Sequence, residues 1–212
     1  MKKRYDAVIF DFDGTVADTM TFLTGLAVGL ISKNYNLAED AAKSKYLATT
    51  GIDFSGQLDI IFPGHPKNTE VADTFEKRKR EEVYKYPVFP DVIPTLDFLK
   101  KNGIKTFICS STRQEIISRY CRLNTIDRLL DEALGFKPEF RKGDQIELVL
   151  KSYFLNPCNV FFVGDSLRDA DFAVEKNIGF MGISRIFSEA QFMEKGAKSV
   201  VSLSELRGLF ED

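Results

Sequence analysis

The sequence has no tryptophan, one histidine and three cysteines among its 212 residues. The single histidine, His65, lies in a Gly-His-Pro sequence typical of a loop, so a Ser-His-Asp catalytic arrangement has little support. Cys109, Cys121 and Cys158 are odd in number and share no metal-ligand spacing. Because Cys109 and Cys158 lie in or beside apolar runs, we expect buried thiols in a reducing cytosol.

An excess of charge of one sign and long apolar runs are also lacking. With 29 basic and 31 acidic residues, the net charge is −2, which gives no attraction to nucleic acid or anionic lipid. No apolar run approaches the roughly 20 residues that span a bilayer. The N-terminal apolar stretch, residues 7–10, is too short for a secretory signal. We expect an unprocessed cytoplasmic protein, a monomer or weak dimer, with no membrane or nucleic-acid partner.

Short apolar runs alternate with amphipathic stretches, which predicts an α/β fold with a Rossmann-like parallel sheet. In such a sheet the active crevice lies at the carboxyl ends of the strands. We predict strands at 7–10, 105–109, 160–163, 179–183 and 199–201, and a weaker one near 132–134. We predict helices between them at 91–102, 112–123, 143–154, 168–177 and 188–194.

The stretch from residue 18 to 86 contains no convincing strand. Its apolar residues repeat as on one buried helical face, at Leu23, Leu26, Ala27 and Leu30. Further helices are predicted at 39–48, 55–62 and 68–86. We therefore predict a core of residues 1–17 and 87–212, and an inserted α-helical cap domain, residues 18–86, over the crevice.

Two acidic residues follow the first predicted strand, in DFDGT. In an extended chain Asp11 and Asp13 share one face, and Gly14 then permits a sharp turn. Two carboxylates about 4 Å apart repel by roughly 1–4 kcal/mol at surface-like dielectrics, so we expect a cation or a shared proton between them. The alternative interpretation is a turn rich in Asp and Gly with no chemical role.

Polar residues also end two further strands. In IKTFICSSTRQE, Ser110 precedes a helix N-terminus, where a hydroxyl and free N–H groups can bind phosphate. Thr112 and Glu115 have the spacing of a capping box, which assigns Thr112 to structure. In VFFVGDSLRDADFA, Asp165 and Asp169 suit Mg²⁺, which takes oxygen ligands. Capping of the helix is the alternative for Asp169.

A cluster this negative needs a basic residue before it can approach a phosphate. Lys142, at the start of a predicted helix, is the favoured candidate, and Lys137 in GFKPEF is the alternative. The run EKRKREE, residues 76–82, alternates in sign, which is typical of a solvated helix face with ion pairs. We do not assign that run to the site.

DFDGTVADT, the Ser110 element, a following lysine and GDSLRD, in this order, resemble the four motifs of the haloacid dehalogenase-like phosphohydrolases. The resemblance covers nearly the whole chain and is greatest to the phosphoglycolate phosphatase and β-phosphoglucomutase branch, whose helical cap falls at the insertion. That branch commonly has Lys-Pro in its third motif; here Lys142 precedes Gly143, whereas Lys137 precedes Pro138.

The resemblance implies a role for each of these residues. Asp11 would attack phosphorus and become an aspartyl phosphate, and Asp13 would protonate the leaving oxygen and then activate water. The phosphoryl oxygens would be held by Ser110, Ser111 and Lys142. The Mg²⁺ site would be formed by the Asp11 and Asp165 side chains and the Asp13 carbonyl, with Asp169 in support.

The resemblance thus predicts a Mg²⁺-dependent phosphatase of a small phosphorylated metabolite. A sugar phosphomutase of the β-phosphoglucomutase type uses the same core and is the alternative, and a catalytically inactive binding or regulatory module is a third. A dinucleotide-dependent oxidoreductase is disfavoured because no G-x-G-x-x-G follows the first strand.

Overall fold

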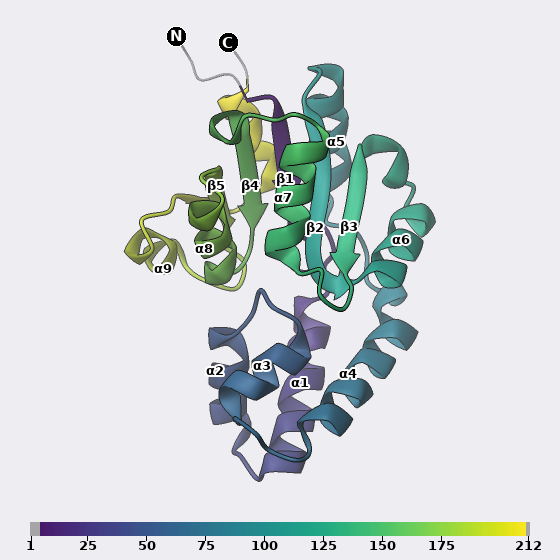
Figure 1. Cartoon of the computed structure of the whole chain (residues 1–212), viewed down its shortest axis with the longest axis vertical. Helices are drawn as coiled ribbons and strands as arrows, with labels where there is room; N and C mark the ends of the chain where they lie inside the picture. Colours follow the sequence, from purple (N-terminus) through teal and green to yellow (C-terminus); the bar gives the residue numbers. More distant parts are fainter. Residues whose placement is uncertain (1–4, 211–212) are drawn as a thin grey trace.

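The computed structural model describes residues 5–210 and contains one sheet of six parallel strands in the order β3-β2-β1-β4-β5-β6 (Figure 1). The strands are β1 (Ala7–Phe10), β2 (Lys105–Arg113), β3 (Glu132–Phe136), β4 (Val160–Gly164), β5 (Gly179–Ile183) and β6 (Ser199–Val200). This topology confirms the predicted Rossmann-like α/β fold. The chain order reverses at β1, between β2 and β4, and ligands of such sheets bind at this point.

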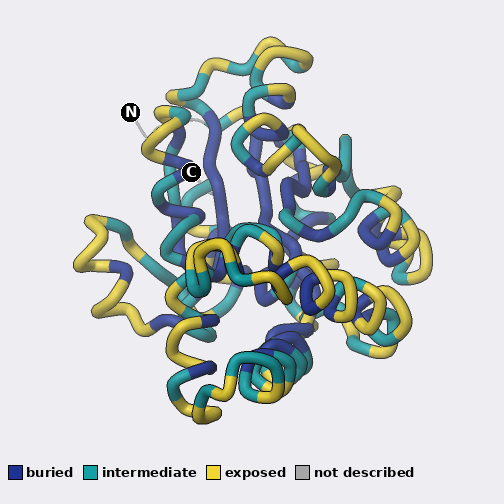
Figure 2. The backbone as a smooth tube through the Cα atoms, turned by 60° about the horizontal axis from the view of Figure 1, so that its bottom comes forward, coloured by how far each residue is buried: buried dark blue, intermediate teal, exposed yellow. Residues whose placement is uncertain are grey.

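The central strand β1 contributes to a separate apolar layer on each face of the sheet. Val8 and Phe10 pack on one face, and Ala7 and Ile9 pack on the other, as the two-residue period of a strand requires. The first face is covered by α5 (Val92–Lys101), α6 (Gln114–Leu123) and the 3₁₀ segment Leu203–Leu209. The second is covered by α7 (Lys142–Ser152) and α8 (Leu167–Glu175), and α9 (Glu189–Glu194) packs near β6. Figure 2 shows the strands buried and the outer sides of the helices exposed.

Four helices between β1 and α5 form a lobe facing the carboxyl ends of the strands (Figure 1). They are α1 (Met20–Tyr35), α2 (Glu39–Ala48), α3 (Phe54–Ile61) and α4 (Asn68–Glu82). The lobe has its own apolar cluster, in which Leu23 and Ala27 are buried and Leu26 and Leu30 pack at its edge. The single helix predicted at 68–86 ends earlier, because a 3₁₀ turn, Val83–Lys85, follows α4.

The two connections between the lobe and the sheet lie side by side. Ala17 forms an antiparallel bridge with Val88, the Asp18 N–H donates to the Pro87 carbonyl at 3.0 Å, and the Phe89 N–H donates to the Val16 carbonyl at 3.1 Å. The chain therefore leaves and re-enters the core through one paired crossing. The division into a core and a cap domain stays a prediction.

Two local predictions are wrong. The helix predicted from residue 112 begins at Gln114, because β2 continues to Arg113, which still pairs with Phe136 of β3. Thr112 is therefore a strand residue and caps no helix. Cys158, predicted to be buried, is exposed because it lies in the turn before β4, whereas Cys109 is buried as predicted. Cys121 is also buried, and all three thiols are free. Within residues 5–210, no helix is both long and apolar enough to span a membrane.

Candidate active site

Asp11 follows the last residue of β1 and forms a buried ion pair with Lys142, the first residue of α7. The Lys142 ammonium lies 2.8 Å from Asp11 Oδ1 and 2.7 Å from Asp169 Oδ1, and all three side chains are almost fully buried. Burial raises the pKa of Asp11 to about 7, although the Lys142 charge opposes this rise. Burial opposes the charge of Lys142, but Asp11 and Asp169 hold its pKa above the ordinary value. The core thus contains one cation between two carboxylates.

Three buried carboxylates lie close enough to share one metal ion. Oxygens of Asp11, Asp165 and Asp169 are within 4.8 Å of one another. Burial, and then the charges of the other two, raise the pKa of Asp165 well above its ordinary value. Such a dense set of carboxylates is stable as anions only with a cation, and its all-oxygen chemistry fits a hard divalent ion.

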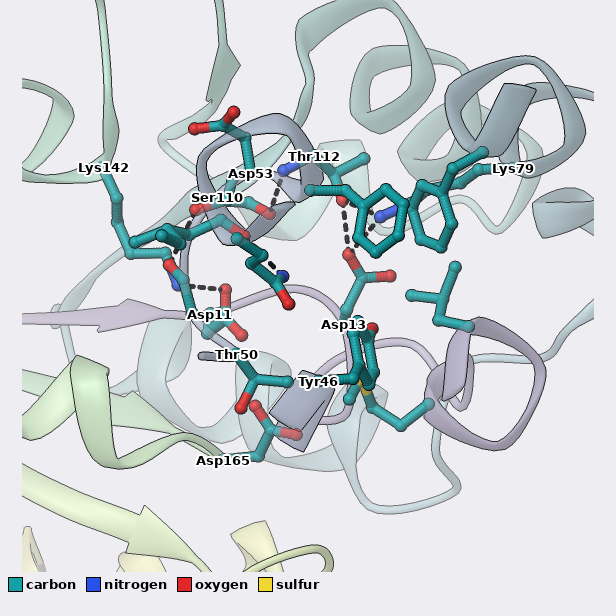
Figure 3. A pocket seen from close by; sticks show the side chains of 18 of the residues that line it. Asp11, Asp13, Tyr46, Thr50, Asp53, Lys79, Ser110, Thr112, Lys142 and Asp165 are labelled. Atoms are coloured by element: carbon teal, nitrogen blue, oxygen red, sulfur yellow. Dashed lines mark hydrogen bonds and ion pairs between the residues drawn. The ribbon is translucent and has the colours of Figure 1, made fainter. Parts of the chain in front are cut away.

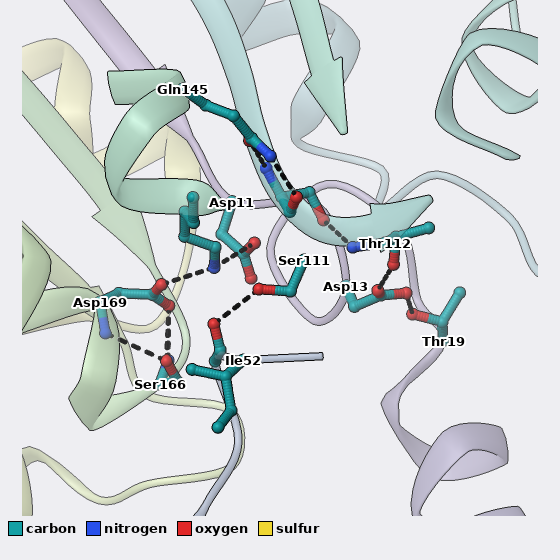
Figure 4. A network of polar contacts seen from close by, with 12 residues as sticks. Asp11, Asp13, Thr19, Ile52, Ser111, Thr112, Gln145, Ser166 and Asp169 are labelled. Carbon is teal, nitrogen blue, oxygen red and sulfur yellow. Dashed lines mark hydrogen bonds and ion pairs between the residues drawn. The ribbon is translucent and has the colours of Figure 1, made fainter. Parts of the chain in front are cut away.

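Asp169 caps α8 and also accepts from Lys142. Its Oδ1 accepts from Lys142, and its Oδ2 accepts from the backbone N–H of Ser166 at 3.1 Å and from the Ser166 hydroxyl at 2.7 Å (Figure 4). These bonds complete a capping box at the start of α8. Both carboxylate oxygens of Asp169 are therefore engaged, which leaves Asp11 and Asp165 as the better-placed metal ligands.

Asp13 lies apart from the Asp11, Asp165 and Asp169 carboxylates. It accepts hydrogen bonds from the Thr19 hydroxyl at 2.7 Å, from the Lys79 ammonium at 2.7 Å and from the Thr112 hydroxyl (Figures 3 and 4). Burial alone would raise the pKa of Asp13, but the Lys79 charge and these hydrogen bonds hold it below its ordinary value. The two acids of DFDGT therefore occupy electrostatically opposite environments: burial favours a proton on Asp11, and Lys79 favours the ionised form of Asp13.

The tip of β2 is held by a buried glutamine. Gln145 of α7 accepts from the Ser110 N–H at 2.8 Å and donates to the Ser110 carbonyl at 3.0 Å (Figure 4). The Ser110 hydroxyl accepts from the Thr112 N–H at 3.0 Å, so its own hydrogen remains available to a ligand. The Ser111 hydroxyl donates to the Gly51 carbonyl at 2.8 Å, which joins the core to the lobe.

A cavity of about 60 Å³ lies between the sheet and the lobe. The core side contributes six predicted site residues, of which Asp11, Asp13, Ser110, Lys142 and Asp165 are labelled in Figure 3. Ser111 is the sixth. The lobe contributes an apolar wall with a few polar groups, chiefly Leu23, Tyr46, Phe54, Phe75 and Lys79. The sequence-predicted residues thus converge, apart from Asp169, which lies behind the lining and reaches the site through Lys142.

Lys79, Thr112, Thr19 and Gln145 were not predicted as site residues. The interpretation of residues 76–82 as a solvated face is wrong for Lys79, whose side chain is only 7% exposed. A signal was present, because Lys79 follows the buried Phe75 by four residues and therefore belongs to the buried face of α4. The alternative lysine, Lys137, is exposed and lies over the ring of Phe140.

Residues 8–183 match the family model of haloacid dehalogenase-like hydrolases. The chain belongs to this family. The predicted family and the predicted phosphohydrolase class are thereby confirmed, and since hydrolases of this family generally use a divalent metal, the carboxylate cluster has a ready explanation.

Individual relatives agree with this assignment. A haloacid dehalogenase-like hydrolase domain-containing protein of Arabidopsis thaliana is 26% identical over 182 residues, which cover 84% of this chain and 69% of the relative. A haloacid dehalogenase-like family protein from Streptococcus pneumoniae has the same fold, with a TM-score of 0.82, 19% identity and coverage of 98% of this chain and 99% of its own. A predicted phosphoglycolate phosphatase from Haemophilus somnus superimposes with a TM-score of 0.73 at 17% identity and 98% coverage of both chains.

Proposed function

We propose that this protein is a Mg²⁺-dependent phosphatase that hydrolyses a small phosphorylated metabolite through a phosphoryl group carried on Asp11. The observation that carries the proposal is the contrast between the two acids of DFDGT. Asp11 lies against Lys142 and the other buried carboxylates, whereas Asp13 is held apart by Lys79, Thr112 and Thr19. Paired carboxylates in opposite environments are typical of a division between nucleophile and proton carrier.

Asp11 and Asp165 would hold the metal ion with their side chains, and Asp13 would add its backbone carbonyl. Asp169 would orient Lys142 and support the metal indirectly. When bound, Mg²⁺ would neutralise charge on the phosphate and keep Asp11 ionised despite its raised pKa.

The chain's own groups account for the transfer of the phosphoryl group. A carboxylate oxygen of Asp11 forms a bond to phosphorus while the ester P–O bond breaks, and the leaving oxygen takes a proton from the Asp13 carboxyl group. Water then forms a new P–O bond as the Asp11–phosphorus bond breaks. In that second step Asp13 takes the proton of the water, and its bonds to Lys79 and Thr112 favour the ionised form that this requires. The same contacts disfavour the protonated form before the first step and make it a stronger acid toward the leaving oxygen.

The phosphoryl oxygens would be held by the Ser110 hydroxyl, by Lys142 and by groups at Ser111. Because Ser111 donates its hydroxyl to Gly51, its backbone N–H is the better candidate for this contact. Fixed donors of this kind stabilise a charged transition state without reorganisation.

Turnover of phenyl phosphate tests this function. We expect Mg²⁺-dependent release of phosphate that chelation abolishes and that Asp11→Asn lowers by at least about 10³-fold. Asp97→Asn, on the outer side of α5, is the matched control and should leave the rate unchanged. Acid quenching with ³²P-labelled ester should trap label on the wild type but not on Asp11→Asn. Activity retained in Asp11→Asn would contradict the nucleophile assignment.

The sugar phosphomutase, the cytoplasmic location and the monomer or weak dimer state remain predictions. Incubation with a sugar bisphosphate distinguishes a phosphomutase from a phosphatase, because a mutase interconverts isomers without releasing phosphate.

A further inference from the structure

The lining of the cavity contains more acidic than basic side chains. Its acidic lining residues are Asp11, Asp13, Asp53, Glu76 and Asp165, and its basic ones are Lys79 and Lys142. A divalent cation and the dianionic phosphate of a substrate would roughly offset each other. The lining then retains more carboxylates than ammonium groups.

The charge of each lysine in the cavity is already matched by a carboxylate. Lys142 is bonded to Asp11 and Asp169, and Lys79 is bonded to Asp13 and Thr112. Within the described residues, the cavity lining contains no arginine. A second phosphate or a carboxylate on the substrate would therefore meet no unmatched positive charge in the lining, and its burial there is costly.

The lobe side of the cavity adds two acids and an apolar wall. Asp53 accepts from the Gly56 N–H at the start of α3, and Glu76 of α4 lines the cavity next to Phe75. Phe54 and Phe75 stack at 4.1 Å between ring centroids and are both buried. A leaving group against this wall would meet rings and carboxylates, so a neutral or positively charged group fits better than an anion.

Arg113 reduces this excess of acids but does not remove it. Arg113 lies outside the cavity lining, in an adjoining cleft of about 270 Å³, and its Nε donates to Glu76 Oε2 at 3.1 Å. Arg113 therefore neutralises Glu76 and is itself matched, and the lining keeps four other acids against two lysines. The small volume of the cavity, about 60 Å³, also favours a short leaving group.

We infer that the substrate is the phosphate monoester of a short alcohol that carries no second phosphate or carboxylate. This inference rests on the proposed phosphatase function and narrows it. It excludes phosphoglycolate, pyrophosphate and sugar bisphosphates as preferred substrates, although a structural neighbour is described as a predicted phosphoglycolate phosphatase. It also disfavours the phosphomutase, whose bisphosphate would need a second anion site.

Three two-carbon phosphates test the inference, because their distal group is neutral, positive or negative: 2-hydroxyethyl phosphate, phosphoethanolamine and phosphoglycolate. With Mg²⁺ and the full-length protein, we expect kcat/KM for the first two to exceed that for phosphoglycolate by about tenfold or more. Pyrophosphate should be as poor as phosphoglycolate. A kcat/KM for phosphoglycolate or pyrophosphate equal to or above that for 2-hydroxyethyl phosphate would overturn the inference.

Two variants test the cause of this selectivity. Glu76→Gln and Asp53→Asn each remove one lobe charge, and asparagine preserves the cap of α3. Each should narrow the ratio of kcat/KM between 2-hydroxyethyl phosphate and phosphoglycolate by about threefold or more, whereas the exposed Glu81→Gln on the same helix should leave it unchanged. An unchanged ratio in both variants would overturn the inference, while failure to hydrolyse even phenyl phosphate would instead contradict the phosphatase function.

Discussion

The Lys79 ammonium of the helical lobe lies 2.7 Å from Asp13 Oδ2 at the end of the central strand, and both side chains are largely buried. This ion pair joins two segments 66 residues apart in the chain. It lowers the pKa of the acid proposed to move protons, so the lobe sets the electrostatics of the chemical step as well as covering the crevice.

Replacement of Lys79 by methionine should shift the pH dependence of turnover. Because Lys79 holds the pKa of Asp13 down, its loss should raise that pKa and keep Asp13 protonated to higher pH. The acidic limb of the pH profile of kcat depends on ionised Asp13, the base of the second step. This limb should move upward by about one pH unit. The pH–rate profile of phenyl phosphate hydrolysis measures this shift. Lys77→Met, on the exposed side of α4, is the control, and an unmoved limb in folded Lys79→Met would contradict the assignment.

One substitution at each position tests whether Lys142 or Lys137 is the active-site lysine. Lys142→Met leaves Asp11 and Asp169 without their shared cation and should cost about 3–5 kcal/mol of stability in metal-free protein. It should also lower kcat by at least about 10²-fold. Lys137→Met changes an exposed side chain and should leave stability and kcat near their wild-type values. Chemical denaturation measures the free energy of unfolding, and steady-state kinetics measure kcat. A larger loss of activity in Lys137→Met than in Lys142→Met would make Lys137 the active-site lysine.

Gly14 has a left-handed backbone, with φ at +78°, and faces Asp165. A Cβ added there would lie 1.9 Å from Asp165 Oδ2, so Gly14→Ala must displace a proposed metal ligand. Gly103 has a similar φ of +70°, but a Cβ added there would meet no atom within 4 Å, so Gly103→Ala carries only the backbone strain, about 1–3 kcal/mol. Gly14→Ala should be the less stable of the two and should alone require more Mg²⁺ for half-maximal rate. Equal Mg²⁺ requirements would show that Asp165 tolerates the displacement.

Metal binding should stabilise the fold more at high pH than at low pH. In metal-free protein the pKa of Asp11 is about 7 against an ordinary value of 3.8, and the pKa of Asp165 is also raised. The folded state then binds more protons than the unfolded chain, so the free energy of unfolding should fall as the pH rises from about 4 to about 7. Mg²⁺ needs the ionised carboxylates, so its Kd should be higher at low pH. At one fixed Mg²⁺ concentration, 100 times the Kd at pH 8, the gain in Tm should reach about 5–10 °C at pH 8 and be smaller at pH 5.5.

Thermal unfolding with and without Mg²⁺ at both pH values measures this effect. Asp165→Asn should reduce the gain at pH 8, and Asp171→Asn, on the outer part of α8, should not. A gain independent of pH would contradict binding at the buried carboxylates.

Most of the fold could be predicted from the sequence because its signals are local. The four residues of β1 are all apolar and bounded by acids, and α2 begins and ends where its pattern predicts. Strand tips of a parallel sheet meet at one edge, so Asp11, Ser110 and Asp165 could be grouped from their places in the sequence.

The contacts of the lobe with the core could not be predicted in the same way. Lys79 is one charge among seven in a mixed run, and only the direction of α4 relative to the sheet turns it toward Asp13. Thr112 has the spacing of a capping residue, but pairing of Arg113 with β3 extends the strand past it and turns its hydroxyl to the same acid. These residues depend on tertiary packing, which local periodicity does not encode.

The position of β1 in the middle of the sheet also sets when the site can form during synthesis. Ala7 pairs with Lys105 on one side and with Val160 on the other. β1, which leads into Asp11, is translated before both of these neighbours. It gains its second neighbour only after Val160 and the rest of β4 have emerged. Until then one edge of a wholly apolar strand stays open to other chains, so nascent fragments that end before β4 should depend on chaperones and be prone to aggregate.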